Sequence, residues 1–66
     1  MKQITRGFII YNKIYKSFLE ENGELVETMY EATFWLYEEH AKAEINKCDF
    51  PDEFEIWEII KTIETV

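Results

Sequence analysis

Apolar and polar side chains alternate along the first part of the chain, which is the periodicity of a β-strand. Between Lys2 and Tyr11 the sequence is rich in β-branched and aromatic residues. In a strand, one side would carry Ile4, Arg6, Phe8 and Ile10, and the other Thr5, Gly7, Ile9 and Tyr11. Successive side chains of a strand point to opposite faces of a sheet. We therefore predict a strand over Lys2–Tyr11, followed by a polar turn over Asn12–Lys16.

The next pattern is that of a β-hairpin. Two short segments, Ser17–Glu20 and Glu24–Glu27, flank the dipeptide Asn22-Gly23. Asn-Gly readily supplies the two positive φ angles of a type I′ turn. The sequence predicts a hairpin with this turn type, centred on Asn22 and Gly23.

The middle of the chain admits two interpretations. Thr28 and Glu31 match a capping box that would start a helix at Met29, although its first turns would be apolar nearly all round. We favour an extended segment over Ala32–Phe34 and then a helix over Leu36–Lys47. In that helix Ala41 and Ile45 are expected to face the core.

The end of the chain is also ambiguous. Pro51 disfavours a helical Phe50 and ends the preceding helix. In Phe54–Val66 the isoleucines fall at helical spacing, yet the abundance of β-branched residues favours a strand, which we prefer. The predicted fold is one α+β domain spanning residues 1–66, with a small antiparallel sheet (N-terminal strand, hairpin and C-terminal strand) and one helix packed on a face. The alternative is two C-terminal helices after an N-terminal hairpin.

Size and composition limit how such a chain is stabilised. The 66 residues include five Phe, four Tyr and two Trp, but only one cysteine. A domain of this length buries only about 60% of the surface of its unfolded chain. Cys48 cannot form an intrachain disulfide, and a lone thiol fits a reducing compartment. The first residues lack a signal peptide, and no apolar run is long enough for a membrane span, so we expect a cytoplasmic protein.

Charge is distributed unevenly along the chain. Residues 1–16 hold four basic residues and no acid, whereas the rest holds all 14 acids and three lysines, for a net charge of -7. Such a surface repels phosphates, so direct nucleic-acid binding is not expected. It suits a cationic partner. The alternative is that the acids only keep an aromatic-rich domain soluble.

No catalytic or cofactor motif is found in the sequence. His40 and Cys48 would lie about 12 Å apart along a helix that rises 1.5 Å per residue, too far for proton transfer. The two glycines cannot form a phosphate-binding loop, and the acids match no calcium-loop pattern. We expect no enzymatic activity, no cofactor and no metal.

Four stretches of the sequence resemble a group of small uncharacterised acidic proteins of phages and prophages of Gram-positive bacteria. The matching stretches are Phe8–Lys13, Phe18–Glu24, Glu31–Phe34 and Phe54–Glu58. The sequence departs from the group's pattern at Trp35-Leu36-Tyr37, where a polar helix cap is usual. The resemblance implies a phage origin, and it transfers no functional residue.

Two features therefore point to protein binding. One is four consecutive large apolar residues ending at Tyr37, which no single face can bury, so that Trp35 and Tyr37 are candidate contact residues. The other is a run of acids that a phosphate-binding protein could recognise as a nucleic-acid mimic. These acids are Glu20, Glu21, Glu24, Glu27 and Glu31. Our hypothesis is a module that binds and inhibits or redirects a host protein, for example one that binds nucleic acid. The alternative is a structural or assembly protein acting as a homo-oligomer, for instance a homodimer.

Overall fold

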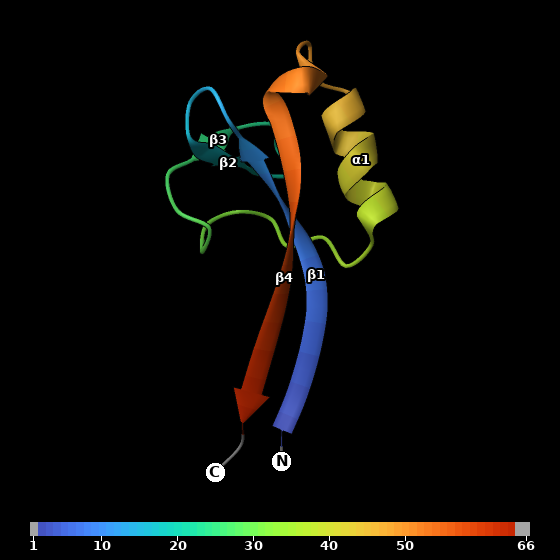
Figure 1. The fold of residues 1–66 in the computed structure, drawn as a ribbon. Helices are drawn as coiled ribbons and strands as arrows, with labels where there is room; N and C mark the ends of the chain where they lie inside the picture. Colours follow the sequence, from blue (N-terminus) through green and yellow to red (C-terminus); the bar gives the residue numbers. More distant parts are fainter. Residues whose placement is uncertain (1, 65–66) are drawn as a thin grey trace.

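The protein is a four-stranded antiparallel sheet with one helix on a face. The computed structural model describes residues 2–64. Its elements are β1 (Lys2–Asn12), β2 (Ser17–Leu19), β3 (Leu25–Val26), α1 (Glu38–Asn46), the short 3₁₀ helix η1 (Pro51–Glu53) and β4 (Phe54–Glu64). The sheet order is β3-β2-β1-β4, and α1 packs beside β1 and β4 (Figure 1). The predicted α+β fold is confirmed, and the alternative with two C-terminal helices is wrong.

The two long strands, β1 and β4, form the longest ladder of the sheet. β1 and β4 pair without interruption from Lys2–Glu64 to Asn12–Phe54. This ladder decides the conformation of the last segment, because its isoleucines gain a partner strand along their whole length. The preferred strand interpretation is confirmed for Phe54–Glu64, and the predicted end at Val66 lies outside the described residues.

The turn between β1 and β2 is organised by a buried asparagine. Asn12 is 1% exposed, and its Oδ1 accepts hydrogen bonds from the backbone N–H groups of Ile14 (2.9 Å) and Tyr15 (2.8 Å). Lys16 closes the turn in a left-handed conformation with φ of 52°. The predicted turn over Asn12–Lys16 is thus held by its first side chain.

The β2–β3 hairpin is present, but its predicted turn type is wrong. Only Gly23 has a positive φ, at 88°, whereas a type I′ turn needs a second one at Asn22. The N–H of Gly23 donates to the carbonyl of Glu20 (3.0 Å), and the N–H of Glu20 to the carbonyl of Glu24 (2.8 Å). These bonds define a three-residue loop with a left-handed glycine at its end. Asn22 instead accepts the N–H of Glu24 through its Oδ1 (2.9 Å).

The segment between β3 and α1, which we call the crossing segment, passes over the edge of β1. Thr28 and Glu31 do not begin a helix; the N–H of Glu31 donates to the carbonyl of Thr28 (3.2 Å) in a single turn. Trp35 then exchanges two backbone hydrogen bonds with Phe8, of 2.7 and 2.8 Å, in an isolated antiparallel bridge. The chain passes this edge before entering α1, which starts two residues later and ends one residue earlier than predicted.

The two faces of the sheet carry different clusters. Against α1 the core is formed by Ile10, Leu19 and Ala41, with Trp35 and Ile45 packed beside it. The orientation predicted for Ala41 and Ile45 is therefore confirmed. On the opposite face Trp57 stacks on Tyr11 with ring centroids 4.5 Å apart, and Phe18 meets the Trp57 ring edge-on at 5.5 Å.

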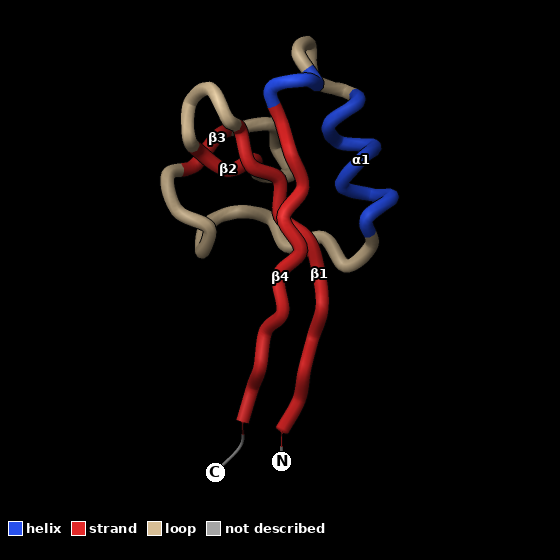
Figure 2. The backbone as a smooth tube through the Cα atoms, in the orientation of Figure 1, coloured by secondary structure: helices blue, strands red, loops and turns tan. Residues whose placement is uncertain are grey.

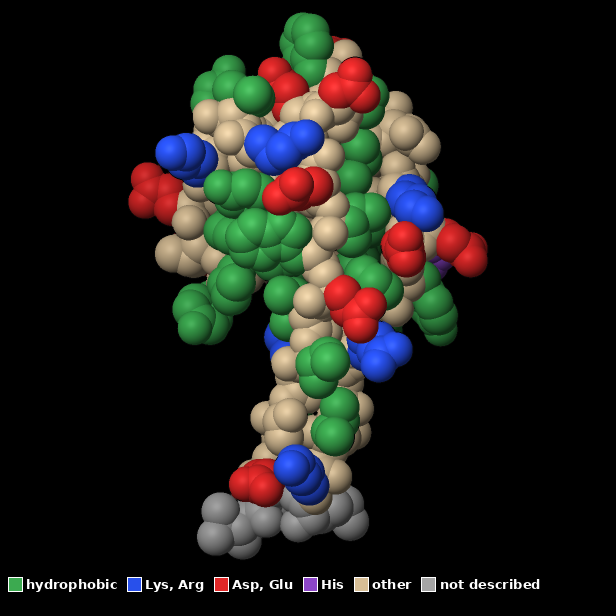
Figure 3. Space-filling model, in the orientation of Figure 1, with side chains coloured by type: hydrophobic (Ala, Val, Ile, Leu, Met, Phe, Trp, Pro, Cys, Tyr) green, Lys and Arg blue, Asp and Glu red, His purple; other side chains and the backbone are tan. Residues whose placement is uncertain are grey.

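One end of the sheet projects beyond the body. Residues 2–6 of β1 and 60–64 of β4, which we call the arm, continue as two strands past α1 and the hairpin (Figure 2). The described chain measures 44 × 23 × 18 Å. The arm is exposed along nearly its whole length, and hydrophobic side chains are visible on it (Figure 3).

Candidate functional site

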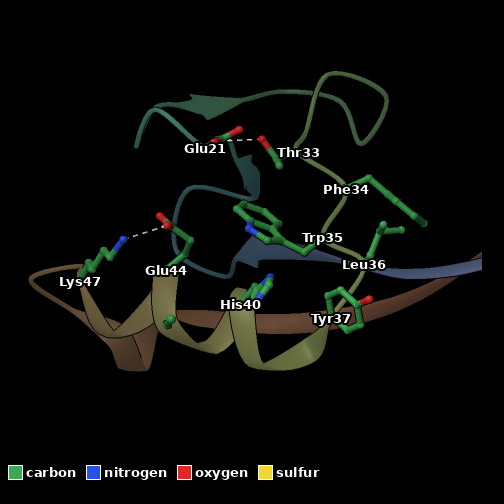
Figure 4. A pocket seen from close by; sticks show the side chains of 10 residues that line it. Glu21, Thr33, Phe34, Trp35, Leu36, Tyr37, His40, Glu44 and Lys47 are labelled. Carbon is green, nitrogen blue, oxygen red and sulfur yellow. Dashed lines mark hydrogen bonds and ion pairs between the residues drawn. The ribbon is translucent and has the colours of Figure 1, made fainter.

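A groove runs between α1 and the loop of the β2–β3 hairpin. Two hollows of about 530 and 510 Å³ share Glu21, Glu44 and Lys47, so they form one continuous depression, the α1–hairpin groove. Glu21 and Thr33 lie on one side, Glu44 and Lys47 on the helix side, and Trp35 between them (Figure 4). The groove is open to solvent and has the size of a site for a peptide side chain or two rather than an enclosed cavity.

Backbone contacts hold the groove in shape. The bridge to Phe8 fixes Trp35 at the base of the groove, where its ring also packs against the core. The hydroxyl of Thr33 accepts the N–H of Glu21 (2.7 Å), which ties the hairpin loop to the crossing segment. Tyr37 is the N-cap residue of α1, and its ring contacts that of His40 edge-on at 5.3 Å.

The groove is acidic. Glu21, Glu44 and Asp49 line it, and Lys47 is the one lysine or arginine among its lining residues. Lys47 Nζ already pairs with Glu44 Oε1 at 3.1 Å, one helical turn away. The Glu21 carboxylate makes no ion pair among the described residues. Among the described residues, the carboxylate of Glu21 is thus free to pair with a cation that enters the hollow, which Trp35 also lines.

Cys48 lies at the helix end of the groove. Its thiol donates a weak hydrogen bond to the carbonyl of Glu44 (3.5 Å). Burial, and then the negative charges of Glu44 and Asp49, raise the pKa of the Cys48 thiol above its ordinary value of 9.0. A thiol held neutral in this way is a poor nucleophile.

Three of the seven predicted contact residues meet in the groove. Glu21 comes from the hairpin loop and Trp35 and Tyr37 from the segment just before α1, and all three line the same hollow. Trp35 is half-buried, so the exposed apolar surface predicted for its segment belongs mainly to Leu36 and Tyr37, which are 58% and 63% exposed. The other four acids do not line the groove. These are Glu20, which is half-buried, and Glu24, Glu27 and Glu31, which are exposed.

Several residues of the groove were not predicted as contact residues from the sequence. Leu36, His40, Glu44 and Lys47 recur at spacings of three or four, as residues on one side of a helix do. That periodicity was a usable signal for a second helix face beside the one that Ala41 and Ile45 bury. His40 and Cys48, weighed above as a possible pair, line different ends of the groove.

Within residues 2–64, no group of three or more His, Cys, Asp or Glu side chains is arranged to hold a metal ion. Among the helices of that same part of the chain, none is both long and apolar enough to cross a membrane.

Comparison with known proteins adds no relative. No protein-family model, no curated protein and no solved structure gives a significant match to the chain. The resemblance to phage proteins therefore stays a prediction, and the site has to be interpreted from its own chemistry.

Proposed function

We propose that this protein is a binding module whose α1–hairpin groove holds a cationic segment of a partner protein. The observation that carries the proposal is the convergence of Glu21, Trp35 and Tyr37 in one groove. An acid and two aromatic rings suit a lysine or arginine side chain, since a guanidinium can pair with a carboxylate and also lie over an indole.

The charge of the whole domain supports the same partner class. A chain of net charge -7 attracts basic surfaces over several ångströms and speeds their encounter. Proteins that bind nucleic acid carry such surfaces, and a bacterial host's nucleic-acid-binding protein is the partner that this acidity suits best. Occupying its basic site would inhibit or redirect it in the cytoplasm.

The groove favours recognition of a short segment rather than mimicry of a long phosphate row. Only Glu21 of the five predicted acids lines the groove, together with Glu44 and Asp49, which the hairpin run does not include. A bound segment would place one or two basic residues between the hairpin loop and α1. An aliphatic residue beside them would cover Leu36 and Tyr37.

The experiment is a titration with a synthetic arginine–leucine peptide, followed by the fluorescence of Trp35. Trp57→Phe leaves Trp35 as the sole indole, because the chain has two tryptophans. The change is remote from the groove, since Trp57 lies on the opposite face with Tyr11 and Phe18. We expect the peptide to shift the Trp35 emission. Glu21→Gln should weaken binding roughly two- to fivefold, the range for an exposed ion pair.

Glu31→Gln is the matched control, because it removes the same charge from an exposed residue outside the groove. Binding through the groove requires that Glu31→Gln weaken the peptide clearly less than Glu21→Gln does. Equal weakening by both variants would reduce the effect to general attraction by the acidic surface and contradict the proposal.

A further inference from the structure

The outer edge of β4 is open along its whole length. β4 ends the sheet order, and within residues 2–64 no strand pairs with its far side. Phe8 directs its N–H and C=O to Trp35, away from β4. The backbone N–H and C=O groups of successive strand residues point alternately to the two sides of the strand. The β4 residues that face such β1 positions therefore direct their N–H and C=O groups away from β1, to the outside of the sheet. On β4 they are Ile56, Glu58, Ile60 and Thr62.

In the arm, neither a helix nor a second sheet of the described chain packs against the outer part of β4. Ile4, Ile60 and Ile63 are 63%, 58% and 56% exposed. A two-stranded ribbon is marginally stable in water by itself, and three or more strands are needed for independent stability. A long, β-branched edge without a cover is a template for another strand.

We propose that the arm is a dimerisation element, in which the outer edge of β4 pairs antiparallel with the same edge of a second copy, centred on Ile60. The two-fold axis passes between the two Ile60 residues, so each copy offers the same surface. The result is one continuous antiparallel sheet in which the central strands have the order β1-β4-β4-β1. Each ribbon thereby gains the additional strands that it lacks.

The charges along β4 permit this register and exclude two of its neighbours. Centring the pair on Glu58 or on Lys61 sets a charged side chain against its own copy, which is destabilising. Centring on Ile60 sets like charges against each other at none of the paired positions within residues 56–64. The pairs are Ile60 with Ile60, Ile59 with Lys61, Glu58 with Thr62, Trp57 with Ile63, and Ile56 with Glu64.

The corresponding edge of β1 is unsuited to self-pairing. Trp35 occupies it at Phe8, which leaves only the arm portion free. Pairing centred on Ile4 would set Lys2 of one copy against Arg6 of the other, two like charges. Basic residues on an edge are a common protection against unwanted strand addition.

The shape of the molecule allows the pairing. The arm projects past α1 and the hairpin (Figures 1 and 3). In the register centred on Ile60, residues 61–64 of each copy lie beside residues 56–59 of the other copy, and the two bodies lie on opposite sides of the two-fold axis. None of the residues that line the α1–hairpin groove lies on β4. Self-association and partner binding therefore use separate surfaces.

Sedimentation equilibrium over a concentration series tests the proposal. The wild-type chain should approach twice the monomer mass as its concentration rises. Ile60→Lys sets two lysines against each other at the axis and should raise the dissociation constant roughly tenfold or more. Ile14→Lys is the control, because it makes the same change at a residue that is 62% exposed in the β1–β2 turn, and it should leave the dimer intact.

Thr62→Pro tests the backbone pairing separately. It keeps every isoleucine and removes an N–H that points away from β1, a position where an edge strand tolerates proline. We expect a folded monomer by circular dichroism. A wild-type chain that stays monomeric throughout, a Thr62→Pro variant that dimerises as the wild type does, or a dimer that Ile60→Lys and Ile14→Lys affect equally would overturn the proposal.

Discussion

Of the two glycines, Gly7 is the one at which the packing leaves no room for a side chain. A Cβ there would overlap the ring of Phe34 and stand 2.8 Å from the carbonyl oxygen of Trp35. Glycine is favoured at this position because the crossing segment approaches β1 closely. An unusual backbone conformation is not the reason, since the φ of Gly7 is not positive. The same approach places Phe34 under Lys61, whose Nζ is 4.1 Å from the ring centroid.

Gly7→Ala should therefore destabilise the protein, although alanine is normally better than glycine in a strand. We expect the free energy of unfolding to fall by about 1–3 kcal/mol, the range for overpacking. Urea unfolding followed by circular dichroism measures it. A gain in stability would show that Phe34 moves away at no cost.

Cys48 gives a pH-dependent prediction. Because burial, Glu44 and Asp49 raise its pKa, the folded protein holds the thiol proton more tightly than the unfolded chain does. The resulting stabilisation is complete below the ordinary thiol pKa of 9.0 and is lost as the pH rises through the higher folded pKa. Alkylation by iodoacetamide should be slow at neutral pH, with a midpoint above that of free cysteine.

Glu44→Gln removes one of the charges that raise this pKa. It should lower the alkylation midpoint and speed the reaction at a fixed pH below it. Glu39→Gln is the control, since Glu39 is exposed on the same helix and is not among the causes of the shift. A wild-type midpoint at or below that of free cysteine would contradict the assignment.

At the scale of elements, α1 begins without a side-chain cap. Tyr37 has the extended backbone of an N-cap residue, with φ of -123° and ψ of 131°, but makes no side-chain capping bond. Glu38 and Glu39 in the first turn compensate in part through the helix dipole. Tyr37 thus stabilises the start of the helix less than a capping side chain would. We expect such a residue at an N-cap when its aromatic ring is used for binding.

Tyr37→Ser should stabilise the fold while weakening the groove. A serine N-cap contributes about 0.5–2 kcal/mol, and a gain of about 1 kcal/mol raises Tm by roughly 4 to 8 °C in a domain of this size. Peptide binding should decrease because an aromatic wall is lost. Tyr30→Ser is the control: Tyr30 is 92% exposed and lies outside any helix, so neither quantity should change. Unchanged peptide binding in Tyr37→Ser would remove Tyr37 from the site.

At the scale of the whole molecule, the net charge separates the two proposed interactions. Added salt screens the attraction between the acidic groove and a basic peptide, so that peptide binding should weaken. It also screens the repulsion between two chains of charge -7, so that the dimer should become more stable. Measuring both dissociation constants over one salt series checks this. Weakening of both equilibria in parallel would contradict pairing through an uncharged edge centre.

Amide exchange should locate the dimer contact. The N–H groups of Ile60 and Thr62 point away from β1 and should exchange fast in dilute protein and slowly in concentrated protein. Those of Ile59 and Lys61 point toward β1 and should depend on concentration much less. Equal concentration dependence at all four residues would mean that dimerisation only stabilises the fold globally.

Local patterns in the sequence determined the elements of this protein. The alternation from Lys2 to Tyr11, the turn residues of the hairpin and the apolar spacing of α1 are local signals. They made β1, the hairpin and α1 predictable within about two residues, although not the turn type. The acidity and the lack of a catalytic motif were likewise visible without a fold.

Only the tertiary structure decided what depends on contacts between distant segments. Phe54–Glu64 is a strand because β1 pairs with it along its whole length, a contact between the two ends of the chain that overrides helical spacing. Trp35 lies at the edge of β1 because Phe8 offers it two hydrogen bonds, and this crossing brings Glu21, Trp35 and Tyr37 together. Local periodicity cannot express such pairings, since their free energy comes from burying surfaces that the sequence keeps far apart.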